Sequence, residues 1–409
     1  MLEKRVPNLL YVTFGENVLE SGILYCQVRE MLISMKEARL VEQVHLISFI
    51  SIRLWFRKRT EYKIMQKELA AKGIGFSFPF SFSSQKWSWF SVPIAYCINL
   101  PILLRIVMKS GCNIIHSRSY MASYLAGKVS KITGIPYIFD PRGPYPEEMV
   151  ANNRWRLSGK TYTTWKRIEQ YISQTSSGVI GVTTQMRDDY KERGAKLSIF
   201  VPNRTNVSRF NANIAPSNET SDVTMIFNGE LDTISYNPEL IARIYSRFHM
   251  STPNLKLQLL SRQHGDYVEK GLAKAGLESS QWTLASVNPG DMPNYLAKGH
   301  FGLVLGIDHE KRWDVFPVKF AEYLAAGLPV LLDRNCGHFL SAFVQKHGIG
   351  IVFDKDDDSS FLQLGDMLKD YEEISKTCRT IVRTKLDISR SAQQYARLYK
   401  QILGDRTHS

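Results

Sequence analysis

The sequence has few cysteines, and those it has are scattered. There are five in 409 residues, and no two of them form a Cys-x-x-Cys pair. An odd number without paired spacing argues against a disulfide framework or a zinc knuckle. The first eight residues are polar and lead directly into a strand-like segment, so we expect no signal peptide. Together these features predict a protein of the reducing cytoplasm.

Motifs for metal and hydrolase chemistry are also missing. No His-Glu-x-x-His, Walker A or Gly-x-Ser-x-Gly pattern occurs. A run from Asp354 to Asp358 contains Asp-x-Asp, which metal-dependent transferases use, but the run follows an expected strand, where aspartate commonly caps a helix. The capping interpretation is favoured, and we expect no metal site.

No run of residues is well suited to span a membrane. The uncharged stretch from Trp87 to Leu104 comes closest, but Pro93 and Pro101 interrupt it, so a core helix or a membrane-contacting patch fits better. Just upstream, Arg53–Arg59 mixes aromatic and basic residues, as an interfacial segment on an anionic leaflet does. A solvated basic helix face has the same composition, and both interpretations stay open.

Acidic residues are outnumbered: 39 Asp and Glu stand against 52 Lys and Arg, a formal net charge of +13. Nucleic acid, an anionic membrane or a phosphate-bearing substrate would each suit this excess, and so would solubility alone. The hydrophobic share of 44% and the charged share of 22% are those of a globular protein. The length suits two domains of roughly 200 residues each.

Short apolar runs alternate with longer amphipathic stretches, and the series occurs twice. This pattern is typical of parallel α/β sheets, whose strands are covered on both faces. It predicts two Rossmann-like, doubly wound domains in tandem. The expected strands are 8–14, 44–50, 112–116, 137–140 and 178–182, followed by 223–228, 255–260, 282–286, 301–305 and 329–332.

A stretch rich in Asn, Ser, Thr and Pro separates the two series, and we place the domain boundary near 205–222. We therefore assign 1–205 to an N-terminal acceptor-binding domain and 206–385 to a C-terminal nucleotide-sugar-binding domain. We expect 386–409 to form a C-terminal helix that packs back toward the first domain. Ligands of such sheets bind beyond the carboxyl ends of the strands, so the cleft between the domains is the expected site.

The segment 313–330, WDVFPVKFAEYLAAGLPV, is the most informative. Pro317 suits the first turn of a helix, and Gly327 suits its end. The start of such a helix, around Pro317 and Val318, attracts anions, and Lys319 in its first turn would add positive charge. Glu322 lies one turn later on the same helix face, where a carboxylate can accept hydrogen bonds from ribose hydroxyls.

This segment resembles the signature of family 4 glycosyltransferases, which have the GT-B fold. The family pattern is an acid, seven residues and a Glu within a P-x-K-x-x-E-Y-x-A-x-G-x-P-V run. The resemblance implies that Glu322 holds the donor ribose and that Asp314 contacts the transferred sugar. The family usually has Glu at the first acid, so Asp314 shortens the reach by one methylene.

Other segments resemble the family in the same order. Gly15 and Gly22 lie in a loop after the first strand, where the backbone passes close to the donor or the acceptor. His116, Arg118, Asp140 and Arg142 end or follow two later strands and are expected on the acceptor side. Arg142 is expected to meet the donor phosphate or the acceptor, with Asp140 orienting it. A buried Asp–Arg pair that only stabilises a loop is the alternative.

One departure concerns the diphosphate. The family usually has Gly-Arg-Leu followed by a Lys after the first strand of the second domain, whereas this chain has Asn228-Gly229-Glu230-Leu231-Asp232. A departing diphosphate needs cations or helix dipoles nearby. Arg262 and Lys319 are the best substitutes, with Gly229 in the donor loop.

These observations predict a retaining, metal-independent and cofactor-free hexosyl- or N-acetylhexosaminyltransferase. Its donor would be a nucleoside diphosphate-sugar, and its acceptor a glycan or lipid-linked oligosaccharide in bacterial surface-polysaccharide assembly. We expect no nucleic acid partner and a cytoplasmic location, with peripheral contact with the inner membrane. Two alternatives remain: a nucleotide-sugar epimerase of the same fold, and a non-catalytic protein that binds sugar or nucleic acid.

Overall fold

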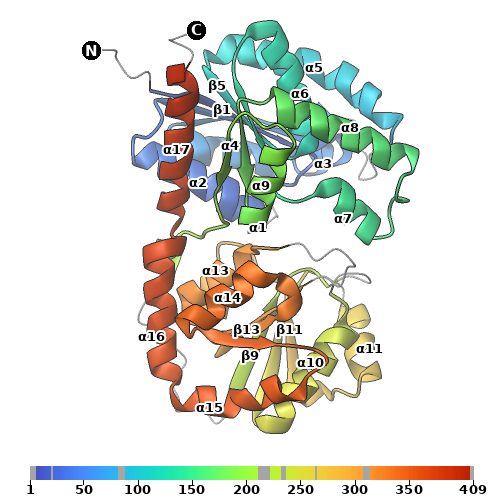
Figure 1. Ribbon diagram of the computed structural model, residues 1–409, viewed down its shortest axis with the longest axis vertical. Helices are drawn as coiled ribbons and strands as arrows, with labels where there is room; N and C mark the ends of the chain where they lie inside the picture. The colour runs from blue at the N-terminus through green and yellow to red at the C-terminus, as the bar shows by residue number, and fades with distance from the viewer. Residues whose placement is uncertain are drawn as a thin grey trace. The chain divides into compact units, whose positions relative to one another are not determined.

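The computed structural model describes residues 6–19, 22–81, 88–210, 222–231, 236–262, 265–306 and 314–405. The chain divides into two compact units (Figure 1). Unit 1 comprises Met1–Pro202 together with Ile388–Ser409, and unit 2 comprises Asn203–Asp387. Most of the predicted linker, 211–221, lies outside the described residues.

Unit 1 is built on a parallel sheet. Its strand order is β3-β2-β1-β5-β6-β7-β8, and β4 pairs with the end of β2. Its strands are β1 (Asn8–Phe14), β2 (Gln43–Ser51), β3 (Ile74–Ser77), β4 (Phe80–Ser81), β5 (Ile114–Arg118), β6 (Tyr137–Asp140), β7 (Gly178–Gly181) and β8 (Ser198–Phe200).

Helices cover both faces of this sheet, which explains why its inner strands are almost entirely buried. The helices are α1 (Gly22–Leu24), α2 (Met31–Glu37), α3 (Ile52–Arg57), α4 (Arg59–Ala71), α5 (Ser91–Ser110), α6 (Tyr120–Thr133), α7 (Tyr145–Ala151), α8 (Lys160–Thr175), α9 (Thr184–Glu192) and α17 (Ile388–Asp405), with a π-helical turn at Tyr25–Glu30. Core residues of α5, α6, α8 and α9 cover one face, and those of α2, α4 and α17 the other.

The last helix, α17, belongs to unit 1 although unit 2 precedes it in the sequence. It packs against α2 (Figure 1). Tyr395 and Tyr399 share a core with Tyr11 of β1 and Ile114 of β5. This helix therefore completes one face of the first sheet.

Unit 2 is a second parallel sheet with strand order β11-β10-β9-β12-β13-β14. Its strands are β9 (Val223–Asn228), β10 (Leu255–Leu260), β11 (Trp282–Ala285), β12 (Phe301–Val304), β13 (Val330–Asp333) and β14 (Gly350–Phe353). Its helices are α10 (Pro238–Ser251), α11 (Gly265–Lys274), α12 (Met292–Leu296), α13 (Val318–Ala326), α14 (His338–His347), α15 (Leu364–Lys369) and α16 (Tyr371–Ile381), with 3-10 turns at Val207–Arg209, Ser279–Gln281, Arg334–Cys336 and Asp358–Gln363 and a π-helical turn at Val382–Leu386.

Both sheets are doubly wound, as the sequence predicts. In unit 1 the strand order reverses between β1 and β5, and in unit 2 between β9 and β12. Ligands of open parallel sheets bind beyond the carboxyl ends of the strands at such a reversal. The fold therefore directs attention to the residues that follow β1 and β5 in one unit, and β9 and β12 in the other.

Candidate functional site

In unit 2, the buried amino group of Lys319 lies at the carboxyl edge of the sheet. Its Nζ lies 4.4 Å from the centre of the Phe227 ring and 4.7 Å from that of Tyr236. It makes no hydrogen bond to any residue that the structure describes. Burial lowers the pKa of Lys319 to about 8, although nearby Cys336 and Glu322 favour the charged form. A cation held this way is poised to pair with an anion.

Gly229 follows β9 and lies directly beside this amino group. A Cβ built on Gly229 would be 3.1 Å from Lys319 Nζ. The absence of a side chain leaves the backbone of this loop open to close approach by a ligand. Arg262 comes two residues after the end of β10, and both it and Glu230 are exposed. Packing therefore does not fix the position of the Arg262 side chain.

Helix α13 begins at Val318, one residue after the Pro317 that the sequence predicts in its first turn. Pro317 is extended (φ −70°, ψ 143°) and precedes Val318, and Gly327 ends the helix in the left-handed region (φ 84°). The first amide groups of a helix lack helical acceptors and carry the positive end of its dipole. The start of α13 therefore adds to the positive field around Lys319.

The predicted ribose ligand, Glu322, lies one turn into α13 and is only 7% exposed. The next residue, Tyr323, fixes the helix against the sheet. Its hydroxyl accepts a hydrogen bond from the Asn228 amide (2.8 Å). Glu322 is thereby held on a helix that is bonded to the end of β9.

Asp314 precedes α13 and lies against the start of α14. A Cβ on Gly337 would be 2.1 Å from Asp314 Oδ1. Gly337 is the residue before α14 and has φ +106°, a conformation that L side chains rarely adopt. The Asp314 carboxylate thus lies beside a helix N-terminus, where the dipole stabilises negative charge.

In unit 1, a second buried cation lies at the carboxyl edge of the sheet. Arg118 ends β5 and is 2% exposed. Its Nε donates to Glu16 Oε2 (3.1 Å), whereas its buried Nη1 has no hydrogen-bond partner among the described residues. Gly15, which precedes Glu16, adopts φ +75° and turns the chain after β1.

Three of the predicted acceptor-side residues form one buried network. Asp140 Oδ2 accepts from Arg142 Nη2 (2.6 Å) and lies 3.1 Å from His116 Nε2. Arg142 also donates to the Tyr395 hydroxyl (3.2 Å), and His116 Nδ1 lies 2.6 Å from that of Tyr399. Arg142 has φ +67°, which is uncommon for a residue with a side chain.

Burial and charge compete in this network. Burial disfavours ionisation of Asp140, but Arg142 and His116 outweigh it, so the pKa of Asp140 is lowered. Burial lowers the pKa of His116 despite the neighbouring Asp140. The arrangement is therefore a neutral imidazole beside an Asp–Arg ion pair.

Gly22, which we expected near the donor, begins α1, with open space where a side chain would project.

Tyr395 and Tyr399 were not predicted as site residues, because only their helical spacing is visible in the sequence. Glu148 of α7 was not predicted either. Its carboxyl group lies over Gly143, where a Cβ would be 2.1 Å from Glu148 Oε1. Burial, together with Glu147, raises the pKa of Glu148 to about 7. A carboxyl group with such a pKa can exchange protons near neutrality.

The aspartate run 354–358 caps a helical turn. Asp357 Oδ1 accepts a hydrogen bond from Ser359 N (2.9 Å) at the start of the turn Asp358–Gln363. Among the residues that the structure describes, no group of three or more His, Cys, Asp or Glu is placed to hold a metal ion. Metal independence stays a prediction.

The chain is similar to known proteins in structure. No protein-family model matches the sequence, and no curated protein does. Solved structures match over nearly the whole chain. HepE of Anabaena in complex with UDP has a TM-score of 0.67 at 13% identity and covers 96% of this chain and 100% of its own. A glycosyltransferase of Rickettsia africae has a TM-score of 0.68 at 15% identity, covering 97% and 99%.

The solved structures of two further enzymes also match over nearly the whole chain. Sucrose-phosphate synthase of Thermosynechococcus elongatus has a TM-score of 0.67 at 14% identity, covering 98% of this chain and 100% of its own. A putative UDP-N-acetylglucosamine 2-epimerase of Listeria monocytogenes has a TM-score of 0.61 at 11% identity, covering 98% of both chains. At these identities the likeness establishes the fold, which is GT-B.

Proposed function

We propose that this protein is a glycosyltransferase that moves a sugar from a nucleoside diphosphate-sugar to an acceptor hydroxyl. The observation that carries the proposal is the buried amino group of Lys319, which has no hydrogen-bond partner among the described residues and lies beside Gly229. An amino group held among aromatic rings gains most when an anion joins it. A nucleotide diphosphate supplies that anion, and the start of α13 supplies further positive potential.

The remaining donor contacts follow from α13. Glu322 would accept hydrogen bonds from the ribose hydroxyls, and Asp314 would contact the transferred sugar. The structural neighbour HepE was solved with UDP and with UDP-glucose, which supports a nucleotide-sugar as the ligand class. Lys319, assisted by Arg262, would bind the diphosphate in place of the Arg and Lys that family 4 glycosyltransferases usually have after the first strand of the second domain.

The proposed reaction is retaining and needs no metal. The acceptor oxygen would attack the anomeric carbon from the face that the diphosphate leaves. The carbon–oxygen bond to the diphosphate breaks as the new glycosidic bond forms, and the acceptor proton passes to the departing phosphate oxygen. Lys319 would stabilise the negative charge that develops on that diphosphate. Arg142, held by Asp140, would contact the donor phosphate or the acceptor.

We propose a hexosyl or N-acetylhexosaminyl group as the sugar and a glycan or lipid-linked oligosaccharide as the acceptor, in the assembly of a surface polysaccharide. Arg118 and the network around Asp140 lie at the carboxyl edge of the unit 1 sheet, where an acceptor is expected. The buried cation Arg118 suits an acceptor that carries a phosphate.

The test is thermal stability in the presence of UDP-, GDP-, ADP- and CMP-sugars and the free nucleotides. A ligand at 100 times its Kd stabilises the native state by about 2.7 kcal/mol. We expect one diphosphate series to raise the Tm of the wild type and to lose its effect in Glu322→Gln and Lys319→Met. The exposed Glu372→Gln variant should respond like the wild type. If no nucleotide at millimolar concentration raises the wild-type Tm, the transferase proposal is wrong.

An epimerase is the second candidate, because one structural neighbour is a putative UDP-N-acetylglucosamine 2-epimerase and the usual diphosphate clamp is missing. An epimerase needs no acceptor. Incubation with the stabilising nucleotide-sugar alone would then yield its epimer, whereas a transferase yields free nucleotide and a glycosylated acceptor.

A further inference from the structure

Helix α5 of unit 1 has an unusual composition for its position. Among the described residues it is the one helix long and apolar enough to cross a membrane, by length and composition only, and just 28% of its apolar window is buried. It contains no acidic residue. Val92, Ala95, Leu103 and Val107 are buried in the core cluster of unit 1. Since one side of α5 lies on the sheet, the helix cannot also span a bilayer.

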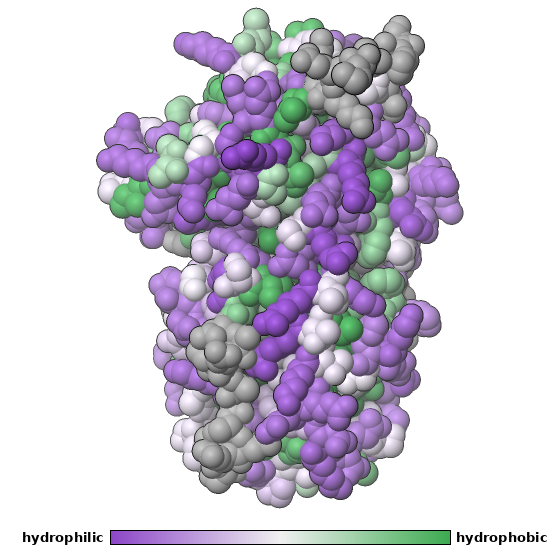
Figure 2. Space-filling model, turned by 90° about the vertical axis from the view of Figure 1, so that its left-hand side faces the viewer, coloured by the Kyte–Doolittle hydropathy of each residue, from purple (hydrophilic) through white to green (hydrophobic). Residues whose placement is uncertain are grey.

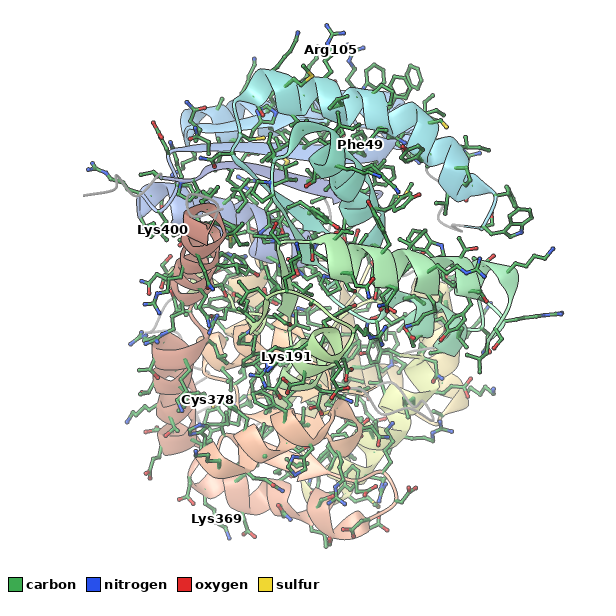
Figure 3. The ribbon with its side chains drawn as sticks, turned by 45° about the horizontal axis from the view of Figure 1, so that its top comes forward. Phe49, Arg105, Lys191, Lys369, Cys378 and Lys400 are labelled. Atoms are coloured by element: carbon green, nitrogen blue, oxygen red, sulfur yellow. The ribbon has the colours of Figure 1, made fainter. Side chains whose placement is uncertain are left out.

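The outer side of α5 is apolar over most of its length. Phe90, just before the helix, is 59% exposed, Ile94 is 55% exposed, and Pro93, Cys97 and Pro101 are also exposed. The first cationic residue of the helix is Arg105, which projects outward in Figure 3, whereas Phe49 lies beneath the helix. An apolar stripe of this length exposed to water is costly in a soluble protein and normally marks an interaction site.

The short helix α3 continues this apolar surface with basic residues around it. Both α3 and α5 contact β4. The Trp55 ring lies 6.0 Å from that of Phe80, and Phe56 is 71% exposed. We name this surface the α3–α5 face. Its exposed apolar residues are Phe56, Phe80, Trp89, Phe90 and Ile94, and its exposed basic residues are Arg53, Arg57 and Arg59.

On the side of unit 1 that carries α17, hydrophilic residues predominate and hydrophobic residues are scattered among them (Figure 2). Such scattering is the ordinary state of a protein surface. The α3–α5 face differs because aromatic residues and arginines are gathered there without an acidic residue between Ile52 and Arg59.

We propose that the α3–α5 face lies in the interface of an anionic lipid bilayer, with α5 parallel to the membrane plane. Exposed Trp and Phe beside arginine are the chemistry of an interfacial helix, in which apolar rings enter the acyl boundary while arginines pair with anionic headgroups. A second copy of the chain would not explain the arginines, because a symmetric contact places this face against itself, and Ile52–Arg59 offers no acidic residue to pair with them.

The position of this face within unit 1 gives it a role. Strand β4 pairs in parallel with the carboxyl end of β2, where Ile50 pairs with Phe80 and Ser51 with Ser81. The α3–α5 face therefore begins at the same edge of the sheet as Arg118 and Asp140. Membrane contact there would bring a lipid-linked acceptor to these residues. This role rests on the proposed function, whereas the membrane contact itself does not.

The test is flotation of the full-length protein with vesicles. We expect binding to vesicles of phosphatidylglycerol and phosphatidylcholine, weaker binding to phosphatidylcholine alone, and weaker binding at 0.5 M NaCl. Phe90→Glu with Ile94→Glu should reduce the vesicle partition coefficient by tenfold or more. Arg53→Ser with Arg57→Ser should reduce it by about thirtyfold at low salt.

Matched controls separate specific contact from general effects. Ile132→Glu changes an equally exposed apolar residue on α6, and Lys376→Ser with Lys400→Ser removes two exposed cations elsewhere. Both should float like the wild type. The proposal is overturned if the wild type does not float, or if the controls lose as much binding as the α3–α5 variants. It is also overturned if the glutamate variant merely dissociates a dimer, seen by light scattering.

Nucleotide-sugar stabilisation, measured without vesicles, tests the donor site separately. Loss of flotation with intact nucleotide response would leave the transferase proposal standing. Flotation without any nucleotide response would leave the membrane contact standing and remove its role in catalysis.

Discussion

His116 Nδ1 and the Tyr399 hydroxyl lie 2.6 Å apart although 283 residues separate them in the sequence. Both side chains are fully buried. Tyr399 belongs to α17 and His116 to β5, so this bond ties the end of the chain to the centre of the first sheet. The same histidine contacts Asp140, so the position of α17 and the predicted acceptor-side residues depend on each other.

Replacing Tyr399 with Phe should destabilise the protein. The ring would keep its packing, but the buried His116 Nδ1 would lose its partner, at a cost of about 1–3 kcal/mol. Urea denaturation measures this loss. The adjacent, exposed Lys400→Ala should stay within about 0.5 kcal/mol of the wild type. A Tyr399→Phe variant as stable as the wild type would show that the bond is not formed.

Asp140→Asn should destabilise more strongly. It removes the charge that compensates Arg142 in the interior, and breaking a buried ion pair costs about 3–5 kcal/mol. Asp188→Asn, which breaks the exposed pair with Arg187, should change little. Folding lowers the pKa of Asp140. Its contribution to the free energy of unfolding is therefore complete above the pKa of the unfolded chain, and it is lost as the pH falls through the pKa of the folded protein. Stability curves of wild type and variant should converge in acid.

Most of the fold could be predicted from runs of apolar residues. Continuous buried strands such as β1 and β5 stand out because both faces of a parallel sheet are covered. Strands β3, β4 and β8 were not predicted. They are only two to four residues long or partly exposed, as in β8 (Ser198–Phe200), where all three residues are half-buried. Short edge strands lack the apolar run on which the prediction depends.

The candidate site also has parts that could be predicted from the sequence and parts that could not. The start and stop of α13 were predictable from Pro317 and Gly327, because each residue has a local conformational preference. The surroundings of Lys319 were not, since Phe227 and Tyr236 come from a segment more than eighty residues earlier. The sequence places a positive charge in the first turn of this helix, and only the tertiary packing reveals that the amino group is buried.

Glu148→Gln should make the protein more stable at neutral pH relative to the wild type. The pKa of Glu148 rises from 4.5 to about 7 on folding, so the folded state binds the proton more tightly. Wild-type stability therefore falls as the pH rises from 4.5 to 7, by about 3 kcal/mol, and the glutamine does not titrate. Urea denaturation from pH 4 to 8 tests this. A constant difference between the two proteins would mean that Glu148 is solvated.

Gly337→Ala should disturb Asp314. The new Cβ would lie 2.1 Å from Asp314 Oδ1, in a backbone conformation (φ +106°) that alanine rarely adopts. We expect a loss of stability of about 1–3 kcal/mol and weaker stabilisation by the donor sugar than by the free nucleotide. Gly348→Ala is the control, because it shares the positive φ but faces open space. It should lose stability while keeping the wild-type preference for the sugar.

Lys319→Met should remove a gain in stability that the wild type shows as the pH becomes alkaline. The pKa of Lys319 falls from 10.5 to about 8 on folding, so above pH 8 the unfolded chain binds the proton more readily than the folded one. Wild-type stability relative to Lys319→Met should therefore rise by about 3 kcal/mol between pH 8 and 10.5. Urea denaturation across this range measures the difference, with the exposed Lys376→Met as a control that shows no such slope.

A bound diphosphate would favour the charged amino group and raise its pKa, so nucleotide binding should weaken in the wild type above pH 8. If the wild type and Lys319→Met bind nucleotide equally at pH 7, this lysine does not hold the diphosphate.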